Sequence, residues 1–393
     1  MTKDNIKSPH VGIGSVQFDG NPCNNHLSKY ADNVKNSIEN HVMPMHGLRF
    51  NTVGVSDGIS MGTKGMNYSL PSRELICDSL ESMVMGHSYD GCVAIAGCDK
   101  NLPGCLMGLI KVNRPSLMVY GGSTLPGIFK ESNVDIVDAF QSYGKMIDGE
   151  ITKEEQNDLI SCCIPQSGSC GGMYTANTMA VAIEAMGMCL PYSSSNPALT
   201  KHKFDECNSV GQTMFNLLYR DIKPSDIITK ESIYNSIKAV IACGGSTNAV
   251  LHLLAISNIL ELGVYIEDFN EIGKDIPVFG NFKPHGKYLM YDLHNIGGTP
   301  LILKYLLEEE VLNGDTLTVT GKTLAQNLEK VDTWELRNLY KHQDIFKIKE
   351  PIKKDSHIRI FKGNLAKHGA VGKITGKEGT YFEGKALVFE DET

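Results

Sequence analysis

The segment between residues 92 and 120 most narrows the folds that this chain can adopt. Residues 92–96, Cys-Val-Ala-Ile-Ala, are an apolar run of strand length, and residues 115–120 form a second such run. A loop at residues 97–101 and a helical pattern over residues 103–111 lie between them. A strand, a helix and a strand at this spacing form a βαβ unit, whose two strands are parallel. The sequence therefore predicts an α/β fold: a parallel-sheet N-terminal domain with flanking helices.

Glycine turns mark the ends of several further predicted helices. A helix over residues 71–85 has Pro71 in its first turn and Gly86 just beyond its end, both common boundary signals. The same reasoning predicts helices over residues 173–186, 248–262 and 301–310, each of which follows a glycine-containing turn.

The pattern changes near residue 350. Short β-type runs at residues 357–361, 370–374 and 385–389 are separated by glycine turns. Three strands bury little apolar surface by themselves. We therefore expect an α/β domain over residues 1–345 and, over residues 346–393, the incomplete N-terminal part of a β-rich, barrel-like second domain.

Charge and hydropathy exclude several classes of protein. The chain has 45 acidic residues against 37 Lys and Arg, a formal net charge of −8, which disfavours a broad nucleic-acid or anionic-membrane binder. No apolar run approaches the ~18–20 residues of a membrane span, and the N-terminus shows no targeting segment. We therefore expect a cytoplasmic protein with no nucleic-acid or membrane partner.

The cysteines do not form a familiar local motif. There are 11 of them, and no C-x-x-C occurs, which argues against a zinc ribbon, a thioredoxin-like motif or a ferredoxin-type loop. Any metal–thiolate site must therefore gather cysteines from distant loops.

Four short segments carry candidate ligands. Cys98, Asp99 and Lys100 follow a predicted strand, where ligands bind in open α/β sheets; the alternative is a buried cysteine beside a surface ion pair. Cys170 precedes a helix, a place that favours a thiolate, although a structural cysteine fits equally well. Cys23, in a C-x-x-H with His26, and Asp57, in a glycine-rich loop, are weak signals when taken alone.

Three partial motifs do not support other functions. Two overlapping G-x-S-x-G frames at residues 54–62 lie in a glycine-rich run without the features of a hydrolase elbow. The Gly321-Lys-Thr323 segment lacks the first glycine of a P-loop, and the Gly12-Ile-Gly14 start lacks the last glycine of a dinucleotide motif.

Several runs, taken together, carry a specific resemblance. They are Asn21-Pro-Cys-Asn-Asn-His26, Cys98-Asp-Lys100, the run from Gly168 to Met179, the loop from Phe50 to Gly62, and the run from Ala242 to His252. Over essentially its whole length, the chain resembles the iron–sulfur dehydratase family that contains the dihydroxy-acid dehydratases and the sugar-acid dehydratases.

The resemblance implies two inorganic cofactors. Cys23, Cys98 and Cys170 would hold a [2Fe–2S] cluster, and three thiolates would leave one iron with an open position. Asp57, Asp99 and a carbamylated Lys100 would bind Mg²⁺, since oxygen ligands suit that ion.

The resemblance also implies an activity. The protein would be a homodimeric hydro-lyase that converts 2,3-dihydroxy-3-methyl carboxylic acids to 2-keto acids in valine and isoleucine biosynthesis. The family's serine base would lie beyond Thr393, so we expect no catalytic base in this chain. The alternatives are a sugar-acid dehydratase and a non-catalytic, truncated chain that binds metal or dimerises.

Overall fold

A four-stranded parallel sheet lies at the centre of the N-terminal part of the chain. The computed structural model describes residues 6–333, 344–376, 381 and 383–390. The strands are β1 (His10–Ser15), β2 (His46–Asn51), β3 (Gly91–Ala96) and β4 (Ser116–Tyr120), in the order β2-β1-β3-β4. All three pairings are parallel, which confirms the α/β class.

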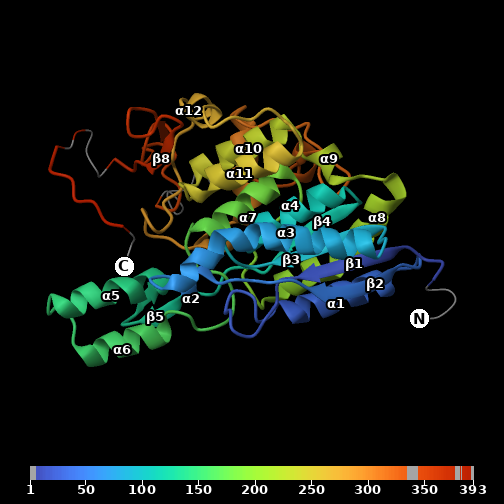
Figure 1. Ribbon diagram of the computed structural model, residues 1–393, viewed down its shortest axis with the longest axis horizontal. Helices are drawn as coiled ribbons and strands as arrows, with labels where there is room; N and C mark the ends of the chain where they lie inside the picture. The colour runs from blue at the N-terminus through green and yellow to red at the C-terminus, as the bar shows by residue number, and fades with distance from the viewer. Residues whose placement is uncertain (1–5, 334–343, 377–380, 382, 391–393) are drawn as a thin grey trace.

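The connecting helices lie on both faces of this sheet. Figure 1 shows α1 (Leu27–Glu39) on one side, and α3 (Ser69–Gly86) and α4 (Asn101–Val112) together on the other. The chain leaves β1 toward β2 and leaves β3 in the opposite direction, toward β4. Because such crossovers are right-handed, their helices must lie on opposite faces. The order of the strands therefore reverses between β1 and β3.

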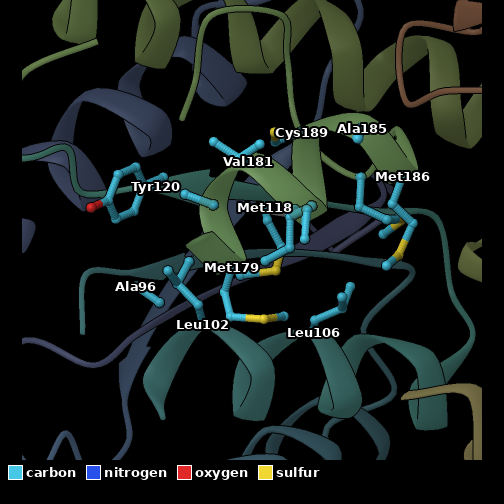
Figure 2. Packing of buried hydrophobic residues seen from close by; sticks show 14 of the residues in the cluster. Ala96, Leu102, Leu106, Met118, Tyr120, Met179, Val181, Ala185, Met186 and Cys189 are labelled. Atoms are coloured by element: carbon cyan, nitrogen blue, oxygen red, sulfur yellow. The ribbon is translucent and has the colours of Figure 1, made fainter. Parts of the chain in front are cut away.

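A second helical layer packs on β4 and α4. Its centre is α7 (Thr175–Met186), every residue of which is buried. Figure 2 shows Met179 of α7 among Met118 of β4 and Leu102 and Leu106 of α4. Around α7 lie α10 (Lys230–Ala242), α11 (Asn248–Ile259) and α14 (Gly298–Glu308), whereas α8 (Lys201–Arg220) packs on α1 and β4.

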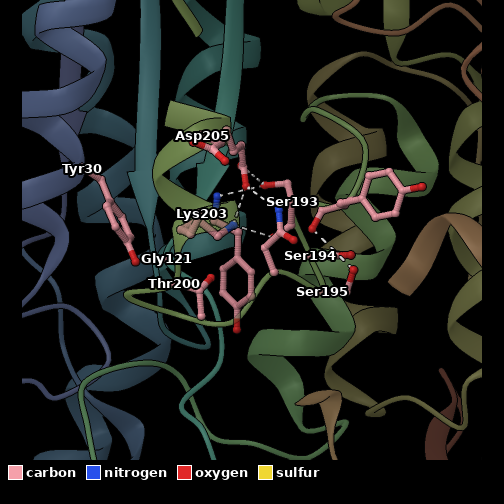
Figure 3. A network of polar contacts seen from close by, with 12 residues as sticks. Tyr30, Gly121, Ser193, Ser194, Ser195, Thr200, Lys203 and Asp205 are labelled. Atoms are coloured by element: carbon pink, nitrogen blue, oxygen red, sulfur yellow. Dashed lines mark hydrogen bonds and ion pairs between the residues drawn. The ribbon is translucent and has the colours of Figure 1, made fainter. Parts of the chain in front are cut away.

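A buried polar network supports the loop that precedes α8. The Lys203 side chain is fully buried, and its ammonium donates to the Ser193 carbonyl and to Glu206 Oε2, both at 2.7 Å (Figure 3). A buried ammonium requires such partners because its desolvation is costly. The loop in turn places the Ala198 N–H on the Ser123 carbonyl, just beyond β4.

The remaining elements are short or peripheral. The hairpin β5 (Gly127–Phe129) and β6 (Ser132–Val134) packs with α5 (Ile136–Ile147) and α6 (Lys153–Cys162) in a small lobe. The other helices are α2 (Asp57–Ser60), the 3₁₀ helix η1 (Lys64–Tyr68), α9 (Pro224–Ile227), α12 (Asp268–Gly273), α13 (Met290–Asn295) and α15 (Leu324–Asn327). None of the helices in the described ranges is both long and apolar enough to cross a bilayer.

The C-terminal residues form a small antiparallel unit. Strands β7 (Ile358–Phe361) and β8 (Ala370–Lys373) pair with each other, and β7 packs on α12. The prediction of a third strand at residues 385–389 was wrong: the segment has no strand structure, and Leu387, Val388 and Phe389 are 78–93% exposed. A strand needs a neighbouring strand for its hydrogen bonds, and the described residues provide none there. The described residues of this part of the chain do not close a barrel, and the domain boundary at residue 345 stays a prediction.

The close contact between α3 and α4 depends on glycine. A Cβ added at Gly104 would lie 2.7 Å from the backbone oxygen of Arg73, and one added at Gly108 would lie 3.1 Å from that of Cys77. Backbone atoms cannot move aside as a flexible side chain can. The absence of a side chain at Gly104 therefore lets the two helices approach.

We predict that Gly104→Ala lowers the free energy of unfolding by about 1–3 kcal/mol, the usual cost of overpacking. Gly144→Ala in α5 is the matched control, because nothing lies within 4 Å of its added Cβ. It should raise the free energy of unfolding by about 0.5–1 kcal/mol, as alanine does in helices. Urea denaturation followed by circular dichroism compares the two; equal effects would contradict the packing argument.

Candidate functional site

The candidate residues lie where parallel strands end. Cys23 follows β1, Asp57 follows β2, and Cys98, Asp99 and Lys100 follow β3. The register aligns these strand ends, with Ser15 opposite both Asn51 and Ile95. Ligands of open α/β sheets bind outside the carboxyl ends of the strands, where the strand order reverses. Cys23 and Cys98 flank this position.

Three thiols converge at the reversal. Cys23 and Cys98 are buried and Cys170 is partly exposed. Hydrogen bonds with the thiols of Cys170 and Cys98, together with burial, hold the pKa of Cys23 well above its usual value. Within the described ranges, no three His, Cys, Asp or Glu side chains close around a single metal ion. Cysteine thiolates are the ligands that iron–sulfur clusters use.

The loop carrying Cys23 approaches that of Cys98 closely because residue 97 is glycine. A Cβ at Gly97 would lie 2.3 Å from the Cys23 carbonyl oxygen. Asn24 Nδ2 donates to Asn101 Oδ1 at 2.7 Å, which links the two loops through buried amides. Both thiols are thus held by backbone contact and by a side-chain hydrogen bond.

The turn carrying Cys170 is held by Asn177 of α7. The Asn177 amide donates to the carbonyl oxygens of Cys170 and Gly172, both at 2.6 Å. Its Oδ1 accepts from the Tyr120 hydroxyl at 2.6 Å. Neither Asn177 nor Tyr120 was selected from the sequence. Their positions were the only available signal: Tyr120 ends β4, and Asn177 lies in the first turn of α7. Neither side chain carries metal-ligating chemistry.

Two carboxylates and a lysine share a second position. Lys100 Nζ lies 2.7 Å from Asp57 Oδ2, and each side chain is 8% exposed. Asp57 Oδ1 also accepts from the Ser69 hydroxyl at 2.8 Å. Burial first, and then the charge of Asp57, raise the pKa of Asp99 to about 6, whereas Lys100, the Thr175 hydroxyl and the Ala176 N–H oppose this. Desolvated carboxylate oxygens are ligands that suit Mg²⁺. An ammonium only donates hydrogen bonds, so Lys100 fits a metal site only after chemical conversion.

A histidine that was not selected from the sequence as a site residue lies close to this group. His252 of α11 is fully buried, and its Nδ1 accepts from Arg73 Nη1 at 3.2 Å. Burial first, and then the charges of Lys100 and Arg73, lower the pKa of His252 to about 3. His252 is therefore neutral, with its proton on Nε2.

The structure does not support a role for His26 as a metal ligand. Its Nε2 is 2.9 Å from the Gly121 carbonyl oxygen, to which it must donate. Burial lowers the pKa of His26 to about 4. The ring is thus a neutral, buried structural group beside Cys23.

Two cavities differ in their relation to these residues. A cavity of about 70 Å³ is lined by Cys23 and Cys170 and by the apolar side chains of Ile59, Ile136 and Ile164. A groove of about 690 Å³ lies at α8 and α13, and none of the six candidate ligands lines it. Its size is therefore no argument for placing the chemistry there.

Comparisons with known proteins show the family of this chain. Residues 8–327 match the family model described as dihydroxy-acid/6-phosphogluconate dehydratase N-terminal, and residues 343–393 match the corresponding C-terminal model. The dihydroxy-acid dehydratase of Francisella tularensis subsp. novicida is 52% identical over 392 residues, which are 100% of this chain and 69% of that protein.

Other relatives come from distant organisms. The chloroplastic dihydroxy-acid dehydratase of Arabidopsis thaliana is 51% identical over 393 residues, covering 100% of this chain and 64% of the relative. That of Lactococcus lactis subsp. lactis is 51% identical over 390 residues, covering 99% and 68%. With both family models matched and half of all positions identical, the chain belongs to the dihydroxy-acid/6-phosphogluconate dehydratase family.

Proposed function

We propose that this protein is a hydro-lyase that dehydrates 2,3-dihydroxy-3-methyl carboxylic acids to 2-keto acids in branched-chain amino-acid synthesis. One observation supports this most directly: three thiols and a group of two carboxylates and a lysine meet where the strand order reverses. The names of the relatives support the same reaction. We further propose a cytoplasmic homodimer, as expected from the sequence.

We propose that Cys23, Cys98 and Cys170 hold a [2Fe–2S] cluster and that Asp57, Asp99 and Lys100 hold Mg²⁺. When bound, these groups supply Lewis acids for the departing C3 hydroxyl and for the substrate carboxylate and C2 hydroxyl. Cys98 and Asp99 are adjacent in sequence. They therefore keep the soft and hard ligand sets a fixed, short distance apart, as a substrate spanning both requires.

Lys100 becomes an oxygen ligand by carbamylation. Its neutral Nζ adds to CO₂, a nitrogen–carbon bond forms, and one proton leaves the nitrogen. The product is an anionic carbamate with two oxygen donors. In the structure the Lys100 ammonium pairs with Asp57 at 2.7 Å. The ammonium must therefore lose a proton before Lys100 can react with CO₂ and bind a cation.

The apolar cavity supports the substrate class. Ile59, Ile136 and Ile164 line it beside two of the thiols. An apolar wall suits a methyl or ethyl branch at C3, whereas the hydroxyls of a sugar acid would lose hydrogen bonds to water there. The lining therefore favours methyl-branched dihydroxy acids over sugar acids.

The first prediction concerns the cluster. Cys98→Ser and Cys170→Ser should each lose most of the [2Fe–2S] absorbance after anaerobic reconstitution, because each removes one of three proposed anchors. Cys162→Ser is the control, since Cys162 is partly exposed and lies at the end of α6. Full retention of iron, sulfide and absorbance in Cys170→Ser would refute the assignment.

The second prediction concerns Lys100. Lys100→Arg keeps a positive charge but cannot form the lysine carbamate. Mg²⁺ affinity measured by calorimetry should fall at least tenfold, while the cluster absorbance is unchanged. Carbon-13 NMR with labelled CO₂ should show a carbamate signal in the parent protein alone; an unmodified lysine in the Mg²⁺-saturated parent would contradict the proposal.

The third prediction tests the substrate class. The complete gene product, with cluster and Mg²⁺ loaded, should form 2-keto acid from 2,3-dihydroxy-3-methylbutanoate with a kcat/KM at least 100-fold above that for gluconate. A 100-fold preference corresponds to about 2.7 kcal/mol, within reach of a few buried polar groups. Preferred turnover of gluconate would favour a sugar-acid dehydratase, and no turnover of either would favour a non-catalytic role.

A further inference from the structure

We propose that His357 and Lys373, in the C-terminal β7–β8 unit, are positioning residues for the Asp99 carboxylate, acting through the turn between α10 and α11. This inference rests on the proposed function, because it treats Asp99 as a ligand of Mg²⁺. It links a unit at the end of the chain to a site formed by its first half.

Both side chains bind carbonyl oxygens of that turn. His357 Nε2 lies 2.7 Å from the Gly245 oxygen. Lys373 Nζ donates to the Gly244 oxygen at 2.8 Å and to the Gly245 oxygen at 3.2 Å. His357 is 1% exposed. Because a carbonyl only accepts, His357 must carry its proton on Nε2. Three hydrogen bonds from one unit thus converge on two consecutive peptide groups.

The turn they bind has little freedom to shift. Gly244 has a φ of +69°, a conformation that glycine adopts without strain. A Cβ at Gly245 would lie 2.8 Å from Thr178 of α7. The next residue, Ser246, donates its backbone N–H to Thr178 Oγ1 at 3.0 Å. The turn is therefore held between the C-terminal unit on one side and α7 on the other.

From this turn, a chain of hydroxyl groups leads to Asp99. Ser246 Oγ lies 3.0 Å from Thr175 Oγ1, and interaction with the Thr175 hydroxyl opposes the rise in the pKa of Asp99 that burial causes. Asn248 donates its backbone N–H to Ser246 Oγ at 3.2 Å and its side-chain amide to Thr175 Oγ1 at 2.7 Å.

The donors in this chain can be assigned. An ionised carboxylate only accepts, so with Asp99 ionised, as a ligand of Mg²⁺ would be, Thr175 would give its single hydroxyl hydrogen to Asp99. Ser246 would then donate to Thr175. Every hydrogen bond points from the α11 start toward the carboxylate, an arrangement in which each bond polarises the next. A shift of Ser246 would therefore weaken the hydrogen bond that orients Asp99.

These contacts could also serve only to attach the C-terminal unit, without any effect on Asp99. That reading predicts a loss of stability but no loss of cation affinity. A second contact of the same unit separates the two readings: Lys362, which follows β7, pairs with Glu267 beside α12 and does not touch the turn.

The experiment measures Mg²⁺ binding to the complete, cluster-loaded gene product by calorimetry, together with thermal unfolding and cluster absorbance. We expect Lys373→Met to weaken Mg²⁺ binding about tenfold at unchanged cluster absorbance. Lys373→Arg, which keeps the donors, should restore most of the affinity. Lys362→Met should bind Mg²⁺ as the parent does.

Ser246→Ala tests the pathway without altering the C-terminal unit. We expect the same tenfold loss, and Lys373→Met combined with Ser246→Ala should lose little more than either alone. Parental affinity in Ser246→Ala, or equal affinities in Lys373→Met and Lys362→Met, would overturn this inference and leave the proposed function intact. No Mg²⁺ binding by the parent would overturn both.

Discussion

The parallel pairing of β1 with β3 determines where the candidate residues lie. The two strands are neighbours, yet their connections leave toward opposite edges of the sheet. The loops that follow them therefore separate above the strand ends and leave space for ligands. Gly97 narrows that space, because its missing side chain lets the Cys23 carbonyl approach. The register of β1 and β3 thus places the thiols of Cys23 and Cys98, and the adjacent carboxylate of Asp99, at the same end of the sheet.

Burial gives this region an electrostatic character that the fold alone does not explain. Asp57, Lys100 and two of the three thiols are buried, and such groups are costly to bury without compensating charge. The pKa values of Cys23 and Asp99 are raised, so the anionic forms of both groups are less favourable here than in water. Cations bound beside these groups would favour the anions and relieve this cost. The chain therefore gives up stability for a site suited to positively charged groups.

The parts of the fold that the sequence predicted are those with a clear apolar pattern. The unit from β3 to β4 was predicted closely, because two continuous apolar runs flank a helical pattern. Strand β1 was missed because Gly12 and Gly14 interrupt its apolar pattern. Both glycines are needed there, since their Cβ positions lie against the rings of Tyr89 and Phe50.

The six candidate ligands were selected from residue type, adjacency and resemblance, and the fold places all six at one edge of the sheet or beside it. Their roles stay predictions. Thr175, Asn177 and Ser246 could not be selected as site residues, because hydroxyl and amide groups are common in turns and acquire meaning only from their partners. The error at residues 385–389 has a similar origin: an apolar run becomes a strand only if a neighbour exists.

The complete burial of α7 has a consequence for the order of events during synthesis. A helix of 12 residues is marginal in water by itself, and α7 has no exposed face, so α7 is stable only when the layers on both sides are present. Helices α10 and α14, which pack on it, come later in the chain. A nascent chain can therefore present Cys23 and Cys98 long before the turn of Cys170 takes its final place. The proposed cofactors would then bind after folding, to a nearly native protein rather than to an unfolded chain.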